Sequence, residues 1–578
     1  MEVDSTAEVS RMSELIEPLA IIFIAAAVLL LIATRYPVPS VPLYILVGIA
    51  VSPLIGPGVT LELAQLGIAF LVFVFGVHAE PGRFLSVARA SEHVAAVQMV
   101  VVGAAGFGVG VLLGFDYVSA AYFATAAALS SSLVGRELAE GDIRRNLIHG
   151  RLTESVHFVQ DLFAVAIILV LGATTFSVDG IALQLGYGVL LLAAALVIRV
   201  YLFEEVFVRL SGDSDELIML TGIGILIGFL ALAETLEVSI VVGAFAADLS
   251  ITQQFEHNLS LQSALESIEN FFTAIFFVTL GSLVVTPTLD VLAIAGLLIV
   301  GIVFVKPIVT IWMLVQEGYD TRTAALTSFS LDQISEFSLI LAISGLLAGQ
   351  ISQSLFDAIL LAAAVTMITS SITYTNEDKL YRLLERSGIF GATAEAIRDR
   401  SSLPDEPLEE HVIVIGYGKL GSSVGSICRE LDKPVVVVDN DPDRFELARE
   451  HHDYCVFADG MSDVAWEFLA PESADLIVST PPQRSVSEYV LSVETDADVI
   501  LRADDTRTAV EFIDAGATYV NVTDFLASEQ FGETLTRLLT DESTPESLRE
   551  QNRRLLRERV SDSGVVGQYG PQTPLFDQ

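Results

Sequence analysis

The chain is 578 residues long, 52% of them hydrophobic, and its 72 acidic residues against 31 basic ones give a net charge of −41. Apolar runs of membrane-spanning length recur from Leu19 to about Tyr374, which excludes an entirely soluble protein. So acidic a balance also excludes nucleic acid as a main partner. The composition therefore predicts a protein embedded in membrane lipid, with a further acidic part that carries no spans.

The distribution of apolar and charged residues predicts four segments. Residues 1–375 form a membrane domain, and residues 376–409 form a linker. Residues 410–540 are expected to be an α/β domain, and residues 541–578 a helix followed by a polar tail. From Asn376 to the end, 40 acidic residues stand against 19 basic ones, so the part without spans is itself acidic.

Lysine is scarce among the basic residues. It supplies four of them, at Lys306, Lys379, Lys419 and Lys433, and arginine supplies the rest. A strong acid excess with arginine preferred over lysine is typical of halophilic archaea, because high salt screens the repulsion between acidic side chains. We therefore expect the protein to come from such an organism.

Thirteen membrane spans are predicted, and basic residues follow them alternately. Loops after spans 1, 3, 5, 7, 11 and 13 carry Arg or Lys, whereas those after the even-numbered spans and after span 9 carry none. Since positively charged loops stay inside, a multi-pass plasma-membrane protein with its N-terminus outside and its C-terminal domain in the cytoplasm is expected. The spans are 19–34, 40–55, 62–77, 94–113, 118–135, 153–172, 181–203, 216–233, 237–250, 269–285, 289–315, 323–348 and 354–374.

Two of these spans are polar where a span should be apolar. Span 5 contains Ser130, Ser131 and Ser132, and span 12 contains Asp332, Gln333 and Glu336 among serines. The spans lie seven apart, an odd offset that reverses orientation, so they predict an inverted repeat with broken crossing helices. The alternative for the serines is close helix packing alone.

Three ionisable or amide side chains fall near the middle of other spans. Gln160 and Asp161 lie in span 6, and Lys306 lies in span 11. Asp161 and Lys306 are each about ten residues from the cytoplasmic end, or roughly 15 Å deep at 1.5 Å per residue. Intramembrane charges are costly and usually functional, so these residues are predicted to lie in the transport path.

A buried carboxylate suits a carrier that alternates between a proton and a metal cation. Burial disfavours its ionised form, so protons compete with cations. Oxygen ligands suit Na⁺ or K⁺, with Asp161 as the ligand and serine hydroxyls completing the shell. Lys306 is expected either to pair with a carboxylate or to bond free carbonyls of the broken helices. Asp332 and Glu336 are four residues apart and are expected to share a helix face, either in the cation path or as support.

Five stretches along the membrane domain resemble motifs of the Kef-type branch of the monovalent cation/proton antiporters. They are ALSSSLV, QDLFAV, VSIVVGAFAADLS, FFTAIFFVTLGSL and SLDQISEFSLIL, with Asp248 and Ser335 at positions where the family usually has glycine. The resemblance implies that Asp161 carries the cation or proton. It places Gln160 where electrogenic relatives have a second carboxylate, which favours one-for-one, electroneutral exchange.

The segment HVIVIGYGKLG combines a buried strand with the GxGxxG spacing of Gly416, Gly418 and Gly421. Asp439 is expected to end a second strand, 18 residues after Gly421, where a ribose-binding acid belongs, and Asp459 is expected to end a third. DLIVST, DVILRA and TYVNV are expected to continue a Rossmann-type sheet. The stretch resembles TrkA-N/RCK regulatory domains, which implies NAD(H) or an adenine nucleotide as a regulatory ligand and pairing into a homodimer.

Together these features predict a Na⁺ or K⁺/proton antiporter regulated by nucleotide, with no catalytic site. One alternative is a nucleotide-gated potassium efflux channel, which lacks a TVGYG-type filter here. Another is a membrane-anchored NAD-dependent sensor or dehydrogenase. The midplane charges argue against it, because an anchor has no need of them.

Overall fold

A computed structural model describes residues 20–29, 31, 39–54, 67, 69–73, 87–144, 147–172, 178–208, 215–251, 259–285, 287–386, 397–398, 400–403, 408–540 and 544–562. The chain divides into two compact units, Met1–Ile389 and Phe390–Gln578. We call the first the membrane unit and the second the α/β unit. Most of predicted span 3 lies outside the described residues.

Over the residues that the structure describes, the regular elements of the membrane unit are helices, as predicted. Six helices among the described residues are long and apolar enough to cross a bilayer, and further apolar helices of 10–17 residues accompany them. The helices are α2 (Ser40–Val51), α5 (Ala88–Leu112), α6 (Tyr117–Ala128), α7 (Ser132–Arg144), α8 (Ile148–Leu171), α9 (Val178–Val197), α11 (Asp215–Thr235), α12 (Ile240–Leu249), α13 (Leu259–Ser282), α14 (Leu289–Val300), α15 (Lys306–Glu317), α16 (Thr321–Phe329), α17 (Glu336–Leu347), α18 (Gln353–Thr375) and α19 (Glu377–Arg386).

Short π-helical segments extend two of these helices. Ile198–Val208 continues α9, and Gly301–Val305 joins α14 to α15. The second segment ends directly before Lys306. This residue begins α15, and its charged side chain is buried inside the protein. Such bulges are common next to functional positions in helices.

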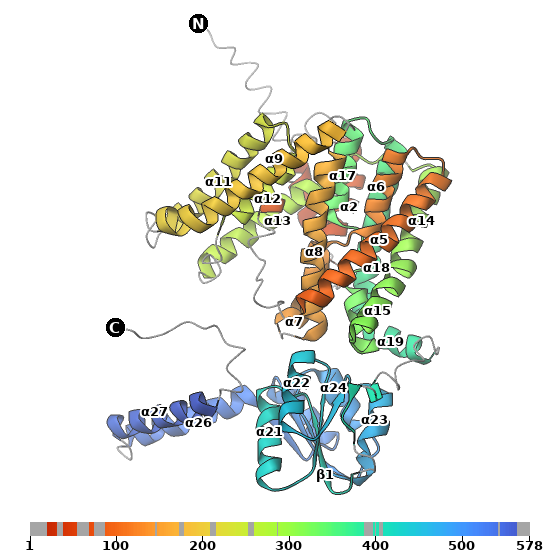
Figure 1. Cartoon of the computed structure of the whole chain (residues 1–578). Helices are drawn as coiled ribbons and strands as arrows, with labels where there is room; N and C mark the ends of the chain where they lie inside the picture. Colours follow the sequence, from red (N-terminus) through yellow and green to blue (C-terminus); the bar gives the residue numbers. More distant parts are fainter. Residues whose placement is uncertain are drawn as a thin grey trace. The chain divides into compact units, whose positions relative to one another are not determined.

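Figure 1 shows how the membrane unit is arranged around α8. On one side α9, α11 and α12 pack together, and on the other lie α5, α6, α14 and α18. Helix α8 contacts α9 and α12 on the first side and α5 and α7 on the second. The side chain at position 161 of α8 is therefore enclosed by protein on both sides.

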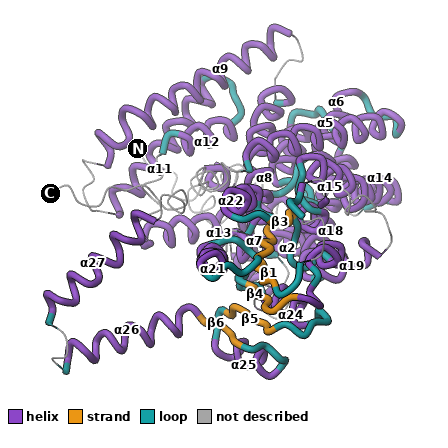
Figure 2. The backbone as a smooth tube through the Cα atoms, turned by 60° about the horizontal axis from the view of Figure 1, so that its bottom comes forward, coloured by secondary structure: helices purple, strands orange, loops and turns teal. Residues whose placement is uncertain are grey.

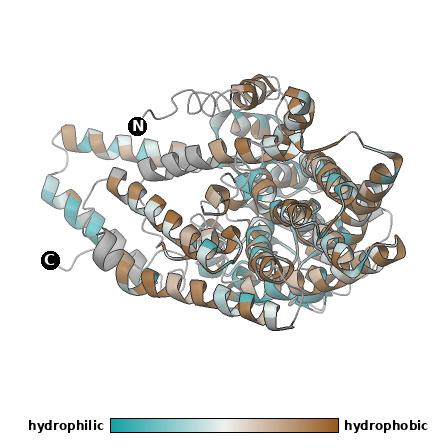
Figure 3. Cartoon of the chain, turned by 90° about the horizontal axis from the view of Figure 1, so that it is seen from above, coloured by the Kyte–Doolittle hydropathy of each residue, from teal (hydrophilic) through white to brown (hydrophobic). Residues whose placement is uncertain are grey.

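Apolar side chains cover the outside of the membrane unit as well as its core. Figure 3 shows hydrophobic residues along most of its helices. Along α14, the π-helical segment that follows it and α15, the side chains of Leu292, Phe304, Ile308 and Trp312 are all more than half exposed. A soluble protein would not leave so much apolar surface uncovered, so these faces are lipid-facing.

The α/β unit contains a parallel six-stranded sheet in the order β3-β2-β1-β4-β5-β6. The strands are β1 (His411–Ile415), β2 (Val435–Asp439), β3 (Tyr454–Phe457), β4 (Ala474–Ser479), β5 (Asp498–Ala503) and β6 (Tyr519–Val522). This is the Rossmann order, in which the chain reverses its direction of winding between β1 and β4. All the strands expected from the sequence are present.

Two layers of helices cover the sheet. On one face, α21 (Lys419–Glu430) and α22 (Pro442–His451) pack on Val412, Val414 and Val437. On the other, α23 (Asp463–Leu469), α24 (Arg484–Leu491) and α25 (Thr506–Asp514) pack on Ile413, Ile415 and other strand residues. Alternate residues of β1 thus face opposite cores, which is why its sequence is apolar throughout.

The last two helices leave the sheet. Figure 2 shows α26 (Thr523–Leu539) and α27 (Pro545–Asp562) running away from β6 instead of folding back over it. In a doubly wound sheet the helix after the last strand normally covers one face. The α21 face of β5 and β6 is consequently left without that cover among the described residues.

Candidate functional site

The two polar spans are both interrupted, and their breaks meet. Helix α6 ends at Ala128, where Leu129 turns extended, and α7 starts at Ser132. Helix α16 ends at Phe329 and α17 starts at Glu336. Ser130 Oγ donates to the carbonyl of Leu331 at 2.9 Å, and Gln333 Nε2 donates to the carbonyl of Ser131 at 3.1 Å.

Lys306 binds both broken helices at once. Its Nζ donates to the carbonyl of Leu129 at 3.0 Å and to that of Gln333 at 3.1 Å. The side chain is buried, with 1% exposed. Of the two roles left open by the sequence, bonding of the free carbonyls is the one observed. Carbonyls at the end of a helix carry partial negative charge, so an ammonium group there is favourable.

The Gln160 side chain hydrogen-bonds the backbone just after the end of α6. Its Oε1 accepts from the Ser130 backbone N–H at 2.9 Å, and its Nε2 donates to Gln98 Oε1 at 2.5 Å. Gln98 in turn donates to the carbonyl of Ala128 at 2.8 Å. Both amides therefore satisfy backbone groups that the break leaves free. Gln98 was not singled out in the sequence, where it is one amide inside an apolar run.

Asp161 lies beside the start of α7 and of α17. Ser132 Oγ is 3.4 Å from Asp161 Oδ1 and 2.6 Å from Glu336 Oε1. The backbone N–H of Leu133 also donates to Glu336 Oε1, at 3.3 Å. Asp161 Oδ2 and Glu336 Oε2 are buried and have no hydrogen-bond partner. Three helices whose residues are far apart in the chain thus bring two carboxylates to one serine hydroxyl.

Asp332 does not share a helix face with Glu336, so that expectation is wrong. The residues between them are not helical, because the break spans Ser330 to Ser335. Asp332 Oδ2 instead accepts from Thr373 Oγ1 of α18 at 3.2 Å, while Glu336 is held by α7. Helical spacing predicts a shared face only where the helix is continuous.

Helices α7 and α8 approach closely next to this site. A Cβ added at Gly135 would lie 2.2 Å from His157 Cε1. His157 is buried one turn before Asp161, and its Nε2 has no hydrogen-bond partner. Gly135 is therefore required where α7 crosses the ring of His157, a constraint that the sequence alone did not indicate.

Several buried oxygen atoms at the crossing of the broken helices have no hydrogen-bond partner. They are Asp161 Oδ2 and Glu336 Oε2 beside Ser132, and Asp332 Oδ1 and Gln333 Oε1 in the break between α16 and α17. Carboxylate, amide and carbonyl oxygens suit alkali cations, whereas softer metals prefer Cys and His. Over the described part of the chain, no group of three or more His, Cys, Asp or Glu side chains is placed to hold a metal ion.

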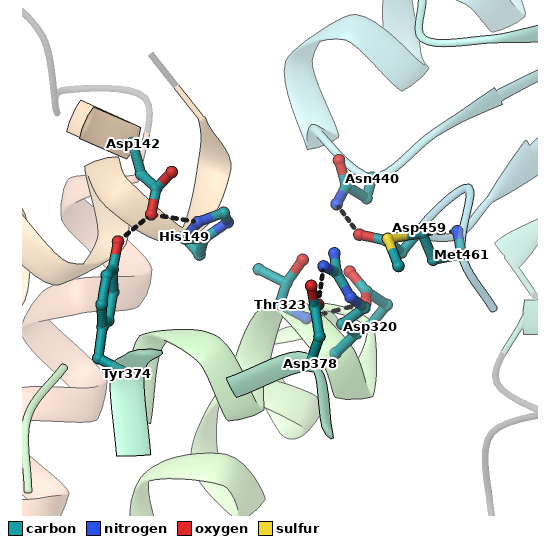
Figure 4. A network of polar contacts seen from close by, with 10 residues as sticks. Asp142, His149, Asp320, Thr323, Tyr374, Asp378, Asn440, Asp459 and Met461 are labelled. Atoms are coloured by element: carbon teal, nitrogen blue, oxygen red, sulfur yellow. Dashed lines mark hydrogen bonds and ion pairs between the residues drawn. The ribbon is translucent and has the colours of Figure 1, made fainter. Parts of the chain in front are cut away.

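A second polar network lies at the ends of α7, α8 and α18 (Figure 4). Tyr374 donates to the carboxylate of Asp142, and His149 Nε2 lies 3.2 Å from the same Oδ2. Nearby, Arg322 of α16 pairs with Asp378 of α19 at 2.7 Å. The ion pair thus ties α16, one half of a broken helix, to α19, which lies in the segment predicted to be the linker.

The glycine-rich loop of the α/β unit has the geometry that each of its glycines requires. Gly416 has a φ of +84°, and a Cβ at Gly421 would lie 2.0 Å from the carbonyl oxygen of Gly416. At Gly418 the nearest atom to an added Cβ is Arg444 Nη1, 4.0 Å away. The loop therefore turns tightly, packs α21 onto β1 and leaves open space over Gly418, at the N-terminus of α21.

Asp439 sits at the end of β2 beside this loop. Its carboxylate accepts from the backbone N–H groups of Tyr417 at 2.6 Å and Asp441 at 2.8 Å. Burial raises the pKa of Asp439 to about 6, and the neighbouring carboxylate of Asp441 adds to the effect while Arg444 opposes it. An ionised carboxylate at the end of this strand can accept hydrogen bonds from ribose hydroxyls.

Asp459 follows β3 at the same edge of the sheet. It accepts from Asn440 Nδ2 at 3.1 Å and from the backbone N–H of Met461 at 2.8 Å, contacts that Figure 4 shows. The loops after β1, β2 and β3 thus gather Gly418, Asp439 and Asp459 at the carboxyl end of the strands. These residues fit a nucleotide, with its phosphates at the N-terminus of α21.

Comparison with known proteins agrees with both units. Residues 20–375 match the family described as sodium/hydrogen exchanger, transmembrane. The chain belongs to the sodium/hydrogen exchanger family. Residues 412–523 match the TrkA-N domain. The Kef-type resemblance and the domain pair predicted from the sequence are therefore confirmed, and the exchanger fold is followed by a Rossmann-like domain.

The curated relatives of this exchanger include potassium-efflux proteins. The glutathione-regulated potassium-efflux system protein KefC of Enterobacter sp. (strain 638) is 27% identical over 455 residues, 75% of this chain and 70% of that one. KefC of Salmonella schwarzengrund is 26% identical over 526 residues, 86% of this chain and 81% of that one. The solved TrkA-N domain of the Escherichia coli inner membrane protein ybaL is 23% identical, with a TM-score of 0.22, and covers 22% of this chain and 98% of that one.

We predict that Lys306→Met destabilises the exchanger by about 3 kcal/mol, because it leaves two buried carbonyls without a donor. Thermal unfolding in detergent measures the effect. Lys379→Met, which removes an exposed lysine from α19, is the matched control and should unfold like the wild type. Equal stability of the two variants would show that Lys306 does not hold the breaks.

Proposed function

We propose that the protein is a secondary-active antiporter that exchanges K⁺ for protons at Asp161. The observation that carries this proposal is the buried Asp161 carboxylate at the crossing of two broken helices, with one oxygen that lacks a hydrogen-bond partner. The potassium-efflux names of the KefC relatives favour K⁺ over Na⁺. Ser130, Ser131, Gln333 and their carbonyls are the further candidate contacts.

The arrangement supports alternating access rather than a pore. Asp161, Glu336 and Lys306 are each at most 3% exposed, so protein encloses the site. A carrier needs such an enclosed site, which opens to one side at a time. In the transport cycle a cation or a proton occupies the site, and the unit changes conformation only when one is bound. Lys306 keeps the broken helices crossed throughout.

We further propose that nucleotide binding to the α/β unit regulates transport. The open space over Gly418 and the acid at Asp439 fit the pyrophosphate and a ribose of NAD(H), or an adenine nucleotide. A ligand shifts a conformational equilibrium only if it binds the two states unequally. The Arg322–Asp378 ion pair offers a route, because it joins α16 to α19, which precedes the α/β unit in the chain.

The alternation of arginine-bearing loops supports a topology with the N-terminus outside and the α/β unit in the cytoplasm. The nucleotide proposed above is an intracellular compound, which agrees with that orientation.

A homodimer is also proposed, with α26 of each copy docked on the other. An apolar groove of about 430 Å³ lies on the α21 face of the sheet, lined by Ile427, Cys428, Leu476, Ile500 and Tyr519 among others. It occupies the place that α26 leaves uncovered. Helix α26 in turn exposes apolar side chains at Phe531, Leu535 and Leu539. A second copy supplies the matching surface without any other partner.

We predict that K⁺ added to inverted vesicles from an antiporter-deficient host drives proton movement in high salt, and that Asp161→Asn abolishes it. The asparagine cannot release a proton, so the exchange cycle cannot close. Fluorescence of a pH-sensitive dye measures the signal, with Na⁺ tested separately. A variant with a wild-type signal would remove Asp161 as the carrier.

The raised pKa of Asp439 predicts how the affinity for NADH depends on pH. Below a pH of about 6 its carboxyl is protonated and accepts hydroxyls poorly, so affinity should fall up to tenfold per pH unit. Asp439→Asn should weaken binding about tenfold or more and remove most of this pH dependence. Titration calorimetry on the full-length protein measures both, with the exposed Glu467→Gln as control. An unchanged affinity in Asp439→Asn would contradict the assignment.

The dimer predicts a specific crosslink. Leu535→Cys should join Cys428 of a second copy through a short bismaleimide, giving a band of twice the monomer mass. The reaction is run at pH 9, because burial raises the pKa of the Cys428 thiol. Leu535→Cys combined with Cys428→Ser is the control and should give no such band. Equal crosslinking in both variants would place α26 elsewhere.

A further inference from the structure

One serine hydroxyl bridges two buried carboxylates on different helices. Ser132 Oγ lies 2.6 Å from Glu336 Oε1 and 3.4 Å from Asp161 Oδ1. Both acids are almost fully buried, at 1% and 3% exposed. The two carboxylates therefore share one small polar space at the point where α7, α8 and α17 meet.

The second oxygen of each carboxylate has no donor. Glu336 Oε2 and Asp161 Oδ2 are both buried without a hydrogen-bond partner. A glutamate that only supports the fold is expected to have its oxygens satisfied by protein donors. Gln160 shows the contrast, because both of its amide atoms bond protein groups. Glu336 and Asp161 instead each have one carboxylate oxygen that is not used in a protein hydrogen bond.

Two carboxylates this close cannot both stay ionised in a low-dielectric site without a positive charge between them. Asp161 repels Glu336 and is attracted by Arg136 of α7. Further buried ionisable groups on the crossing helices are Lys306 at the start of α15, His157 on α8 and Asp332 in the break between α16 and α17. Lys306 donates to two carbonyls, and Asp332 accepts from Thr373 through Oδ2 while its Oδ1 has no hydrogen-bond partner.

We propose that Glu336 is the second carboxylate of the transport site and holds the exchanged ion jointly with Asp161. This inference rests on the proposed antiport function and deepens it. With a proton bound, one carboxyl is neutral and the pair carries a charge of −1. The proton leaves to water, the cation binds between the two ionised carboxylates, and the pair with its cation again carries −1.

This pairing of Asp161 with Glu336 changes what Gln160 implies about the number of carboxylates in the site. Its position lacks the carboxylate of electrogenic relatives, which by itself indicates a site with one carboxylate. Glu336 restores a second one from another helix, yet the exchange remains one proton for one cation. Because the site carries the same charge in both loaded states, the charge moved in the two half-cycles cancels, and the complete exchange is electroneutral.

Transport by purified protein in liposomes tests the pair. Glu336→Gln should raise the KM for K⁺ at least tenfold and shift the pH of half-maximal transport at least one unit lower. Without the neighbouring negative charge, Asp161 releases its proton more easily. Ser132→Ala keeps both charges and removes the bridge, so it should shift that pH in the opposite direction. Glu336→Asp keeps the charge and should retain the wild-type pH profile.

Asp357→Asn is the matched control. Asp357 is a carboxylate on α18 whose Oδ1 accepts from Gln353, away from the pair, and the variant should match the wild type. Wild-type KM and pH profile in Glu336→Gln would overturn the inference and leave Asp161 as a single carrier. The same result would follow if Glu336→Gln and Ser132→Ala shifted the profile in one direction. Absence of K⁺-driven proton movement in the wild type would instead overturn the antiport proposal itself.

Discussion

The membrane unit depends on an ammonium group that bonds two backbone carbonyls inside an apolar environment. Breaking a helix within the bilayer frees N–H and C=O groups, each of which costs several kcal/mol if left unsatisfied there. Lys306 satisfies carbonyls of both breaks, Gln160 takes the N–H of Ser130, and Thr366 Oγ1 takes that of Ile334. Without these partners, the polar space at the crossing would not persist.

The same satisfied breaks explain why two acids are tolerated beside them. Polar groups already gathered at the crossing allow Asp161 and Glu336 to be buried with only part of their hydrogen-bonding capacity used. In the proposed transport cycle, an incoming cation or proton supplies the remaining interaction. Folding has already removed most water from the two carboxylates, so an empty, fully ionised pair is the state of highest electrostatic cost.

The α/β unit uses backbone geometry in a comparable way. Gly416 and Gly421 permit a close approach that a side chain would block, while Gly418 leaves space for a ligand at a helix N-terminus. Two backbone N–H groups hold the buried carboxylate of Asp439 beside that space. In both units, then, the candidate ligand site is built where the backbone leaves its regular hydrogen-bonding pattern.

The sequence by itself determined the class of fold. Apolar length predicts the membrane unit, GxGxxG after a strand predicts the nucleotide loop, and isolated polar residues in apolar runs predict the broken helices, because these patterns are local. Tertiary structure decided which side chains meet. Glu336 faces Asp161 and Asp332 faces Thr373, although helical spacing placed the two acids together. The contacts of Gln98 with Gln160 and of His157 with Gly135 likewise depend on how the helices pack. Contacts between helices far apart in the chain depend on crossing and rotation, which no local pattern specifies.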